Sequence, residues 1–145
     1  MTEKELEAYL HHKIPLARAM GAAVVEALHG GGITLRAPLT LNHNHLGTAF
    51  GGSLNALATL AAYAMLWFEL GEPEAHLVIA ESSMAFLRPV REDLTAICAS
   101  PKPETLARFR EEFARKGKAR IRVEAVLEEE GMRAARFRGT FVAIR

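Results

Sequence analysis

A polar, glycine-containing stretch is the part of the sequence best suited to chemistry; it is LNHNHLGTAFGGS, residues 41–53. It ends in Gly51, Gly52 and Ser53, and a long apolar run follows directly. The first N–H groups of a helix have no partner within the helix and carry partial positive charge, and glycine lets a ligand come close to them. Gly51 and Gly52 are therefore suited to hold a carbonyl oxygen that becomes negative during a reaction, each donor contributing about 3 kcal/mol.

Asn44, seven residues before Gly51, offers a side-chain amide donor that never loses its proton. A purely structural interpretation explains the same residues. Asn and Gly are common in loops, and Thr48 or Ser53 can cap a helix. The residue types alone leave both interpretations open.

The apolar run at 54–70 predicts a helix that ends at Gly71. Its length approaches that of a membrane span, but Asn55, Thr59 and Glu69 interrupt it. We therefore expect a helix buried inside a small domain, with no membrane span.

Turn residues and alternating apolar positions predict the remaining elements. These are a short helix from Thr2 limited by Pro15, strands over 20–27, 33–36, 77–90, 94–99, 121–127 and 133–144, and an exposed amphipathic helix over 103–115. A single helix with almost no polar face, among mostly antiparallel strands, predicts an α+β fold in which the sheet wraps the helix. With no repeat or linker, residues 1–145 are expected to form one domain.

Composition excludes several classes of protein. Half of the residues are apolar and 24% are charged, as in a soluble globular protein. The lone Cys98 excludes an internal disulfide, and no secretory leader opens the chain, so we expect a cytoplasmic location. The net charge of +1 and the lack of a binding motif make nucleic acid an improbable partner.

The charge is unevenly distributed along the chain. Residues 1–100 hold six basic and ten acidic residues, whereas residues 101–145 hold twelve and seven. The basic run over 108–122 is either a solvated face or a docking surface for an acidic partner.

The block at 44–53, the apolar run after it, and the phrase AFLRPV at 85–90 together resemble hotdog-fold thioesterases. Within that superfamily, residues 37–62 are most similar to the YiiD C-terminal domain family. The resemblance covers nearly the whole chain. It implies a hotdog fold in which an antiparallel sheet wraps a long central helix. It also implies a homodimer or a dimer of dimers, with acyl sites at the subunit interface. By position, it assigns the oxyanion-hole N–H to Gly52 and the loop donor to Asn44.

The chain departs from many hotdog hydrolases at Thr59, where those enzymes carry an Asp or Glu that activates water. Threonine is a poor base at neutral pH. Decarboxylation of a malonyl thioester needs an oxyanion hole but no base, because the enolate charge falls on the thioester oxygen. The family is also associated with malonyl-acyl carrier protein decarboxylation in fatty acid synthesis. We therefore predict this reaction, with acyl-thioester hydrolysis and a non-catalytic acyl-binding module as alternatives.

Besides the catalytic set of Asn44, Gly51, Gly52 and Thr59, eight residues are predicted to contact the substrate. They are Asn42, His45, Thr48, Phe50, Ser53, Asn55, Glu81 and Arg88. Glu81 is the candidate base if the enzyme hydrolyses, and Arg88 is a candidate for orienting a carboxylate or phosphate. No metal site is predicted, because the His43-x-His45 pair has no Cys or carboxylate nearby. The only cofactor-like group expected is part of the substrate, either CoA or the phosphopantetheine of acyl carrier protein.

Overall fold

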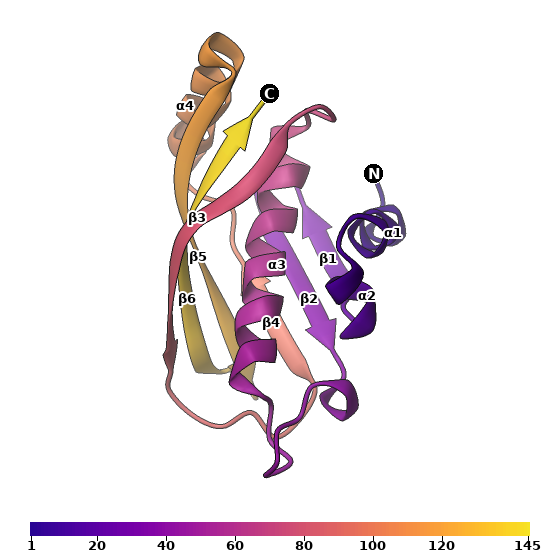
Figure 1. The fold of residues 1–145 in the computed structure, drawn as a ribbon. Helices are drawn as coiled ribbons and strands as arrows, with labels where there is room; N and C mark the ends of the chain where they lie inside the picture. The colour runs from indigo at the N-terminus through magenta and orange to yellow at the C-terminus, as the bar shows by residue number, and fades with distance from the viewer.

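Helix α3 (Gly51–Leu70) lies along one face of a six-stranded antiparallel sheet in the computed structural model, which describes residues 1–145 (Figure 1). The strands are β1 (Ala23–Leu28), β2 (Gly32–Ala37), β3 (His76–Phe86), β4 (Leu94–Cys98), β5 (Lys118–Glu129) and β6 (Met132–Ile144). Their order across the sheet is β1-β2-β4-β5-β6-β3, so β1 and β3 form the two edges. The predicted arrangement of a sheet around a long apolar helix is confirmed.

Twelve of the twenty residues of α3 are buried, since the sheet covers most of the helix surface. The helix ends at Gly71, whose φ of +65° is a left-handed conformation that glycine adopts without strain. By length and composition α3 resembles a membrane span, but 67% of its apolar window is buried inside the protein. It is the core helix of the fold.

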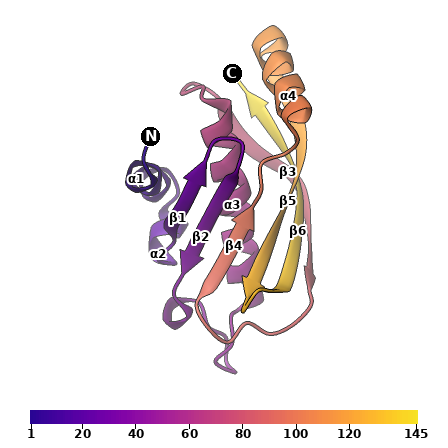
Figure 2. The ribbon, with the colours of Figure 1, turned by 180° about the vertical axis from the view of Figure 1, so that it is seen from behind.

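The remaining helices lie beside the sheet. Helices α1 (Glu3–Lys13) and α2 (Pro15–Ala19) lie next to α3 on the β1 side, as Figure 1 shows. Helix α4 (Pro103–Lys116) lies near the end of the sheet against β5, which is clearest from behind in Figure 2. Its apolar stripe of Leu106, Phe109 and Phe113 is buried, as the amphipathic pattern predicted. A 3₁₀ turn over Leu39–Leu41 precedes the polar loop.

Several boundaries differ from the sequence-based prediction, and two of these differences bear on the site. The expected strand over 20–27 begins only at Ala23, because residues 15–19 form α2 and Gly21 then turns the chain with a φ of +73°. The expected strand over 77–90 spans 76–86, so Arg88 lies in the connection after β3.

Candidate functional site

The first two residues of α3 have unpaired backbone donors. The N–H groups of Ser53 and Leu54 donate to the carbonyl of Phe50 at 2.9 and 3.1 Å, whereas those of Gly51 and Gly52 have no acceptor within the chain. Phe50 at the N-cap provides no side-chain hydrogen bond. Neither Thr48 nor Ser53 caps the helix, as the structural interpretation had allowed. The polarised N–H groups of Gly51 and Gly52 are therefore available to a ligand.

Gly52 lies close to a neighbouring aromatic ring. A Cβ atom at this position would lie 2.5 Å from Cε2 of Phe50, so the exposed Phe50 ring would have to turn away. At Gly51 a Cβ atom would be in ordinary contact, 3.6 Å from the ring of Phe86. Any side chain at position 52 would therefore displace Phe50 from the start of the helix.

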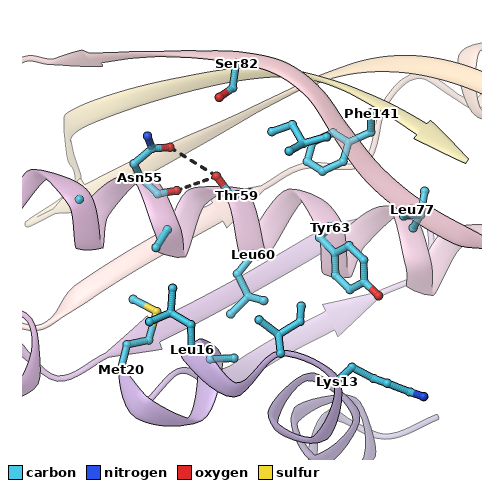
Figure 3. A pocket seen from close by; sticks show the side chains of 15 residues that line it. Lys13, Leu16, Met20, Asn55, Thr59, Leu60, Tyr63, Leu77, Ser82 and Phe141 are labelled. Atoms are coloured by element: carbon cyan, nitrogen blue, oxygen red, sulfur yellow. Dashed lines mark hydrogen bonds between the residues drawn. The ribbon is translucent and has the colours of Figure 1, made fainter.

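A long cavity of about 630 Å³ runs along α3 from Gly52 to Tyr63 (Figure 3). Ten of its fifteen lining residues are hydrophobic, and none is a carboxylate. The lining comes from α1 and α2, from α3, and from β3 and β6; it comprises Lys13, Ile14, Leu16, Ala17, Met20, Gly52, Asn55, Ala56, Thr59, Leu60, Tyr63, Leu77, Ile79, Ser82 and Phe141. This cavity is mainly apolar and holds only a few polar side chains, as ligand sites commonly do.

One stripe of α3 forms the floor of the long cavity. Gly52, Asn55, Thr59 and Tyr63 recur at helical spacing, and none of the four is buried, although most of α3 is. The predicted residues Gly52, Asn55 and Thr59 are thus brought together on one face. Tyr63 was not predicted, although the same spacing extended by one turn would have found it.

Asn55 and Thr59 form a neutral pair within this stripe. The hydroxyl of Thr59 donates to the backbone carbonyl of Asn55 at 2.8 Å and lies 3.3 Å from its Oδ1 (Figure 3). Oδ1 of Asn55 therefore faces Thr59. Nδ2 of Asn55 has no acceptor in the chain and remains free to donate. Neither side chain carries a charge or acts as a base at neutral pH.

Tyr63 lies at the far end of the long cavity. Its hydroxyl is 2.9 Å from that of Tyr9, whose ring stacks on Trp67 at a centroid distance of 4.0 Å. Burial, followed by the hydrogen bond to Tyr9, raises the pKa of Tyr63 above its ordinary value. Tyr63 is therefore neutral at physiological pH and serves as a wall and hydrogen-bonding group.

A second, small cavity of about 390 Å³ lies beside the start of α3 and shares Leu16, Met20, Gly52 and Ala56 with the long one. Its other lining residues are Ala19, Leu41, Asn42, Phe50 and Ser53. The predicted residues Phe50 and Ser53 thus lie at this cavity. Asn42 is buried and donates through Nδ2 to the carbonyls of Met20 and Pro38 at 2.9 and 2.8 Å, so its amide is used in holding the loop.

Asn44 is engaged within its own loop and lines neither of these cavities. Its Oδ1 accepts from the N–H groups of Leu46 and Thr48 at 2.8 and 3.2 Å, and its Nδ2 donates to Thr48 Oγ1 at 2.8 Å and to the carbonyl of Ala49 at 3.5 Å. Asn44 and Thr48 therefore fix the loop that leads into α3. For Asn44 to donate to a substrate as predicted, these bonds would have to be rearranged.

Three other predicted residues lie away from both cavities. Glu81 is exposed and lines a polar depression with Arg122 and Arg138, which shares only Ser82 with the long cavity. Arg88 is exposed, with Nη1 2.9 Å from the sulfur of Met132, and His45 is exposed in the loop. Within one chain, Glu81 is therefore not placed to act as a base at α3.

No local sequence pattern identified several residues that line the long cavity. Lys13, Leu16 and Met20 come from the N-terminal helices and their following turn, and Ser82 and Phe141 come from β3 and β6. They meet only because α1, α2 and the sheet edge pack on either side of α3. No group of three or more His, Cys, Asp or Glu side chains lies close enough together to hold a metal ion.

Comparison with known proteins connects this arrangement to a family. Residues 3–145 match the family model described as "Putative thioesterase (yiiD_Cterm)". A Chlorobaculum tepidum protein of unknown function is 33% identical, with a TM-score of 0.90 over 99% of this chain and 94% of that one. A thioesterase-like protein from Shewanella oneidensis is 26% identical, with a TM-score of 0.83 over 99% of this chain and 97% of the other.

A Pseudomonas aeruginosa protein, 23% identical with a TM-score of 0.85 over 99% of this chain and 96% of the other, shares the fold. The match to the family model covers almost the entire chain, including both cavities and the loop that leads into α3. The chain is therefore a hotdog-fold protein and belongs to the YiiD C-terminal family of thioesterase-like proteins.

Proposed function

We propose that the protein decarboxylates a malonyl thioester, most naturally malonyl-acyl carrier protein, to the acetyl thioester. The observation that carries the proposal is the pair of free N–H groups at Gly51 and Gly52 beside cavities that contain no carboxylate. The pair provides neutral stabilisation of an oxyanion but no group that activates water.

In this reaction the bond between the malonyl carboxylate and its methylene carbon breaks, and carbon dioxide leaves. The bonding electrons form an enolate whose negative charge rests on the thioester oxygen, next to the two N–H groups. Asn55 Nδ2 is one helical turn further along and adds a neutral donor to the same region. Solvent then supplies the proton that converts the enolate to an acetyl group.

The malonyl group is assigned to the small cavity because none of its nine lining residues is charged. The substrate carboxylate therefore gains no ion pair there. Interactions that stabilise the bound substrate as much as the transition state do not accelerate the chemical step. An apolar surrounding instead favours loss of the charged carboxylate as neutral carbon dioxide.

Hydrolysis of an acyl thioester is the second candidate, and membership in a thioesterase family favours it. The same N–H groups would then stabilise a tetrahedral oxyanion. Asn55 and Thr59 would have to position the attacking water without a carboxylate at hand.

The proposal includes a homo-oligomer and an acidic carrier protein as partners. The basic residues considered in the sequence lie exposed on α4 and on the outward face of β5; they are Arg108, Arg115, Lys116, Lys118, Arg120 and Arg122. Arg110 differs, because it binds Glu69. The exposed set is a suitable docking surface for an acidic protein.

One assay tests these alternatives. The protein is incubated with malonyl-acyl carrier protein and with a series of acyl-CoA species, and the products are identified by mass. Acetyl thioester is the expected product. Free thiol would instead establish hydrolysis, and bound but unchanged substrate would indicate an acyl-binding module.

A further inference from the structure

A polar depression of about 670 Å³ over β3, β6 and β5 has no part in the proposed reaction. Its lining residues are Glu81, Ser82, Ser83, Arg122, Val123, Glu124, Arg138, Gly139 and Thr140. We propose that this depression binds a free α-amino acid, with the carboxylate at Arg122 and the ammonium group at Glu81. The depression shares only Ser82 with the long cavity, so this proposal and the proposed reaction can fail separately.

The register of three strands brings the binding groups together. Thr140 on β6 lies directly opposite Glu81 on β3 and Arg122 on β5. Along β5, Arg122 and Glu124 alternate with buried residues that face α3, so this row of side chains points away from the helix. Two strand spacings of about 4.8 Å separate Glu81 from Arg122 by about 10 Å. One charged group of each sign therefore lies on either side of Thr140.

Thr140 provides independent evidence that the depression is a binding site. The residue is only 7% exposed, and its hydroxyl makes no hydrogen bond within the chain. Because no fully enclosed side-chain oxygen or nitrogen in the protein lacks a partner, the exposed part of Thr140 includes this hydroxyl, which opens into the depression. A hydroxyl in such a position needs a partner from outside the chain.

Glu81 and Arg122 are both free to bind a ligand. Each is exposed, and neither forms an ion pair within the chain. In the next row, Arg138 Nε donates to Glu124 Oε1 at 2.6 Å, which balances both charges and leaves the Nη groups of Arg138 as donors. The depression therefore offers one free charge of each sign. A purely acidic ligand would meet Glu81 and a purely basic one would meet Arg122, whereas a zwitterion pairs with both.

An α-amino acid has the dimensions that this pair of charges requires. Its ammonium nitrogen and a carboxylate oxygen lie about 3 Å apart, and each charged hydrogen bond adds about 2.8 Å. The total of roughly 9 Å is close to the separation of Glu81 and Arg122. The carboxylate then lies beside Thr140, whose hydroxyl can donate to it, and Arg138 lies diagonally across the strands within reach of a long side chain.

A nuclear magnetic resonance titration of the isotope-labelled protein with glycine tests the proposal. Glycine is expected to shift the backbone signals around the depression and to saturate in the millimolar range, since water reaches both charge pairs. Acetate and methylammonium each carry one of the two charges and should bind about threefold to tenfold more weakly. The two charges of γ-aminobutyrate lie about 2.5 Å further apart, so it should also bind more weakly than glycine.

Substitutions assign each end of the ligand. Arg122→Gln should reduce the affinity for glycine to that for methylammonium, and Glu81→Gln should reduce it to that for acetate. Thr140→Val removes the hydroxyl but keeps the shape of the side chain, and it should weaken glycine binding about threefold. The matched control is Arg120→Gln, which removes an exposed arginine of β5 outside the depression and should leave the affinity unchanged. Glu81, Arg122 and Arg120 are all exposed, so their replacement does not threaten folding.

Several results would overturn the proposal. If glycine shifts no signal near the depression, or binds no more tightly than acetate, no amino acid is recognised there. Equal losses in Arg122→Gln and Arg120→Gln would mean that only the overall charge matters. If γ-aminobutyrate binds as tightly as glycine, the ligand is not an α-amino acid. If Arg122→Gln instead dissociates a self-associated form in sedimentation velocity, a second copy of the chain covers this face.

Discussion

At the scale of single residues, Thr59 is the position that most directly tests the proposed reaction. It lies between Asn55 and Tyr63 on the cavity floor and cannot take a proton from water. We predict that Thr59→Asp raises the rate of free thiol release from acyl-CoA at least about tenfold, because a positioned carboxylate acts as a general base. The neutral Thr59→Asn is the control of similar size and should show no such gain. Equal rates in the two variants would mean that position 59 does not adjoin the reacting carbonyl.

Asn44 is predicted to act mainly through the loop that it fixes. Asn44→Ala leaves the N–H groups of Leu46 and Thr48 without their acceptor and should lower the free energy of unfolding by about 0.5–1.5 kcal/mol, because water can reach both groups. Asn44→Asp keeps that acceptor and should lose less. Urea denaturation measures both. If Asn44→Ala abolishes turnover while stability is unchanged, the side chain contacts the substrate, as the family resemblance implied.

Cys98 is buried on β4 and has no role in the site. Burial raises the pKa of its thiol to about 12, from an ordinary value of 9.0. Below pH 9 both the folded and unfolded chains keep the proton, so stability is unaffected. Above pH 9 only the unfolded chain releases it, and the thiol's contribution to the free energy of unfolding falls by about 1.4 kcal/mol per pH unit until about pH 12.

The measurement is the difference in free energy of unfolding between the wild-type protein and Cys98→Ala, taken at pH 8 and pH 10. The difference should shift by about 1.4 kcal/mol in favour of the variant at the higher pH. A difference that is constant across this range would show that the thiol ionises normally in the folded protein.

At the scale of elements, the C-terminal end of α3 is fixed by one buried carboxylate. Glu69, whose side chain is 3% exposed, accepts from the N–H of Gly30 at 2.6 Å, from Ser100 Oγ at 3.3 Å and from Arg110 Nη2 at 3.1 Å. It therefore joins α3 to the β1–β2 turn, to the segment after β4 and to α4. Through these contacts it holds α3 in its position against the sheet.

Glu69→Ala is predicted to lower the free energy of unfolding by about 2–3 kcal/mol, because Gly30, Ser100 and Arg110 all lose a common acceptor. The loss stays below that of a fully buried ion pair, since the Arg110 side chain is 45% exposed and water can solvate it. Glu72→Ala, which removes an exposed carboxylate three residues later, is the control and should change stability by less than about 0.5 kcal/mol. Equal losses in the two variants would contradict this role.

The elements that could be predicted are those with strong periodicity. The apolar run of α3, the stripe of α4 and the alternation along β5 each identified a buried face correctly. Helix α2 was missed, because five residues are too few for a helical period to be visible. Asn55 and Thr59 are four residues apart on one helix, so helical periodicity alone predicts that they share a face.

At the scale of the whole molecule, the rest of the site depends on packing that no local pattern encodes. Lys13 and Met20 reach α3 only because α1 and α2 fold against it, and Glu81 faces away from α3 because of its position on β3. The β-bulge in β3 between Ile79 and Glu81 changes which side chains point to each face, so simple alternation could not place Glu81.

The two edges of the sheet differ in a way that favours pairing through β3. The β1 edge is six residues long and contains a bulge. The N–H of Val24 on this edge already donates to Glu7 Oε1 at 2.9 Å. The β3 edge is eleven residues long, and its Val78 and Phe86 are 50% and 56% exposed. A long, uncovered strand with apolar side chains is a template for pairing with another chain.

We therefore predict a homodimer joined through β3, which would place the cavity-lining residues Leu77, Ile79 and Ser82 next to the partner. Replacing both Val78 and Phe86 by Lys should yield a monomer in sedimentation velocity, because like charges would face one another across the interface. The control Leu28→Lys alters an apolar residue of β1 that is 52% exposed, and it should remain dimeric. If the double variant sediments as a dimer, or Leu28→Lys as a monomer, the interface lies elsewhere.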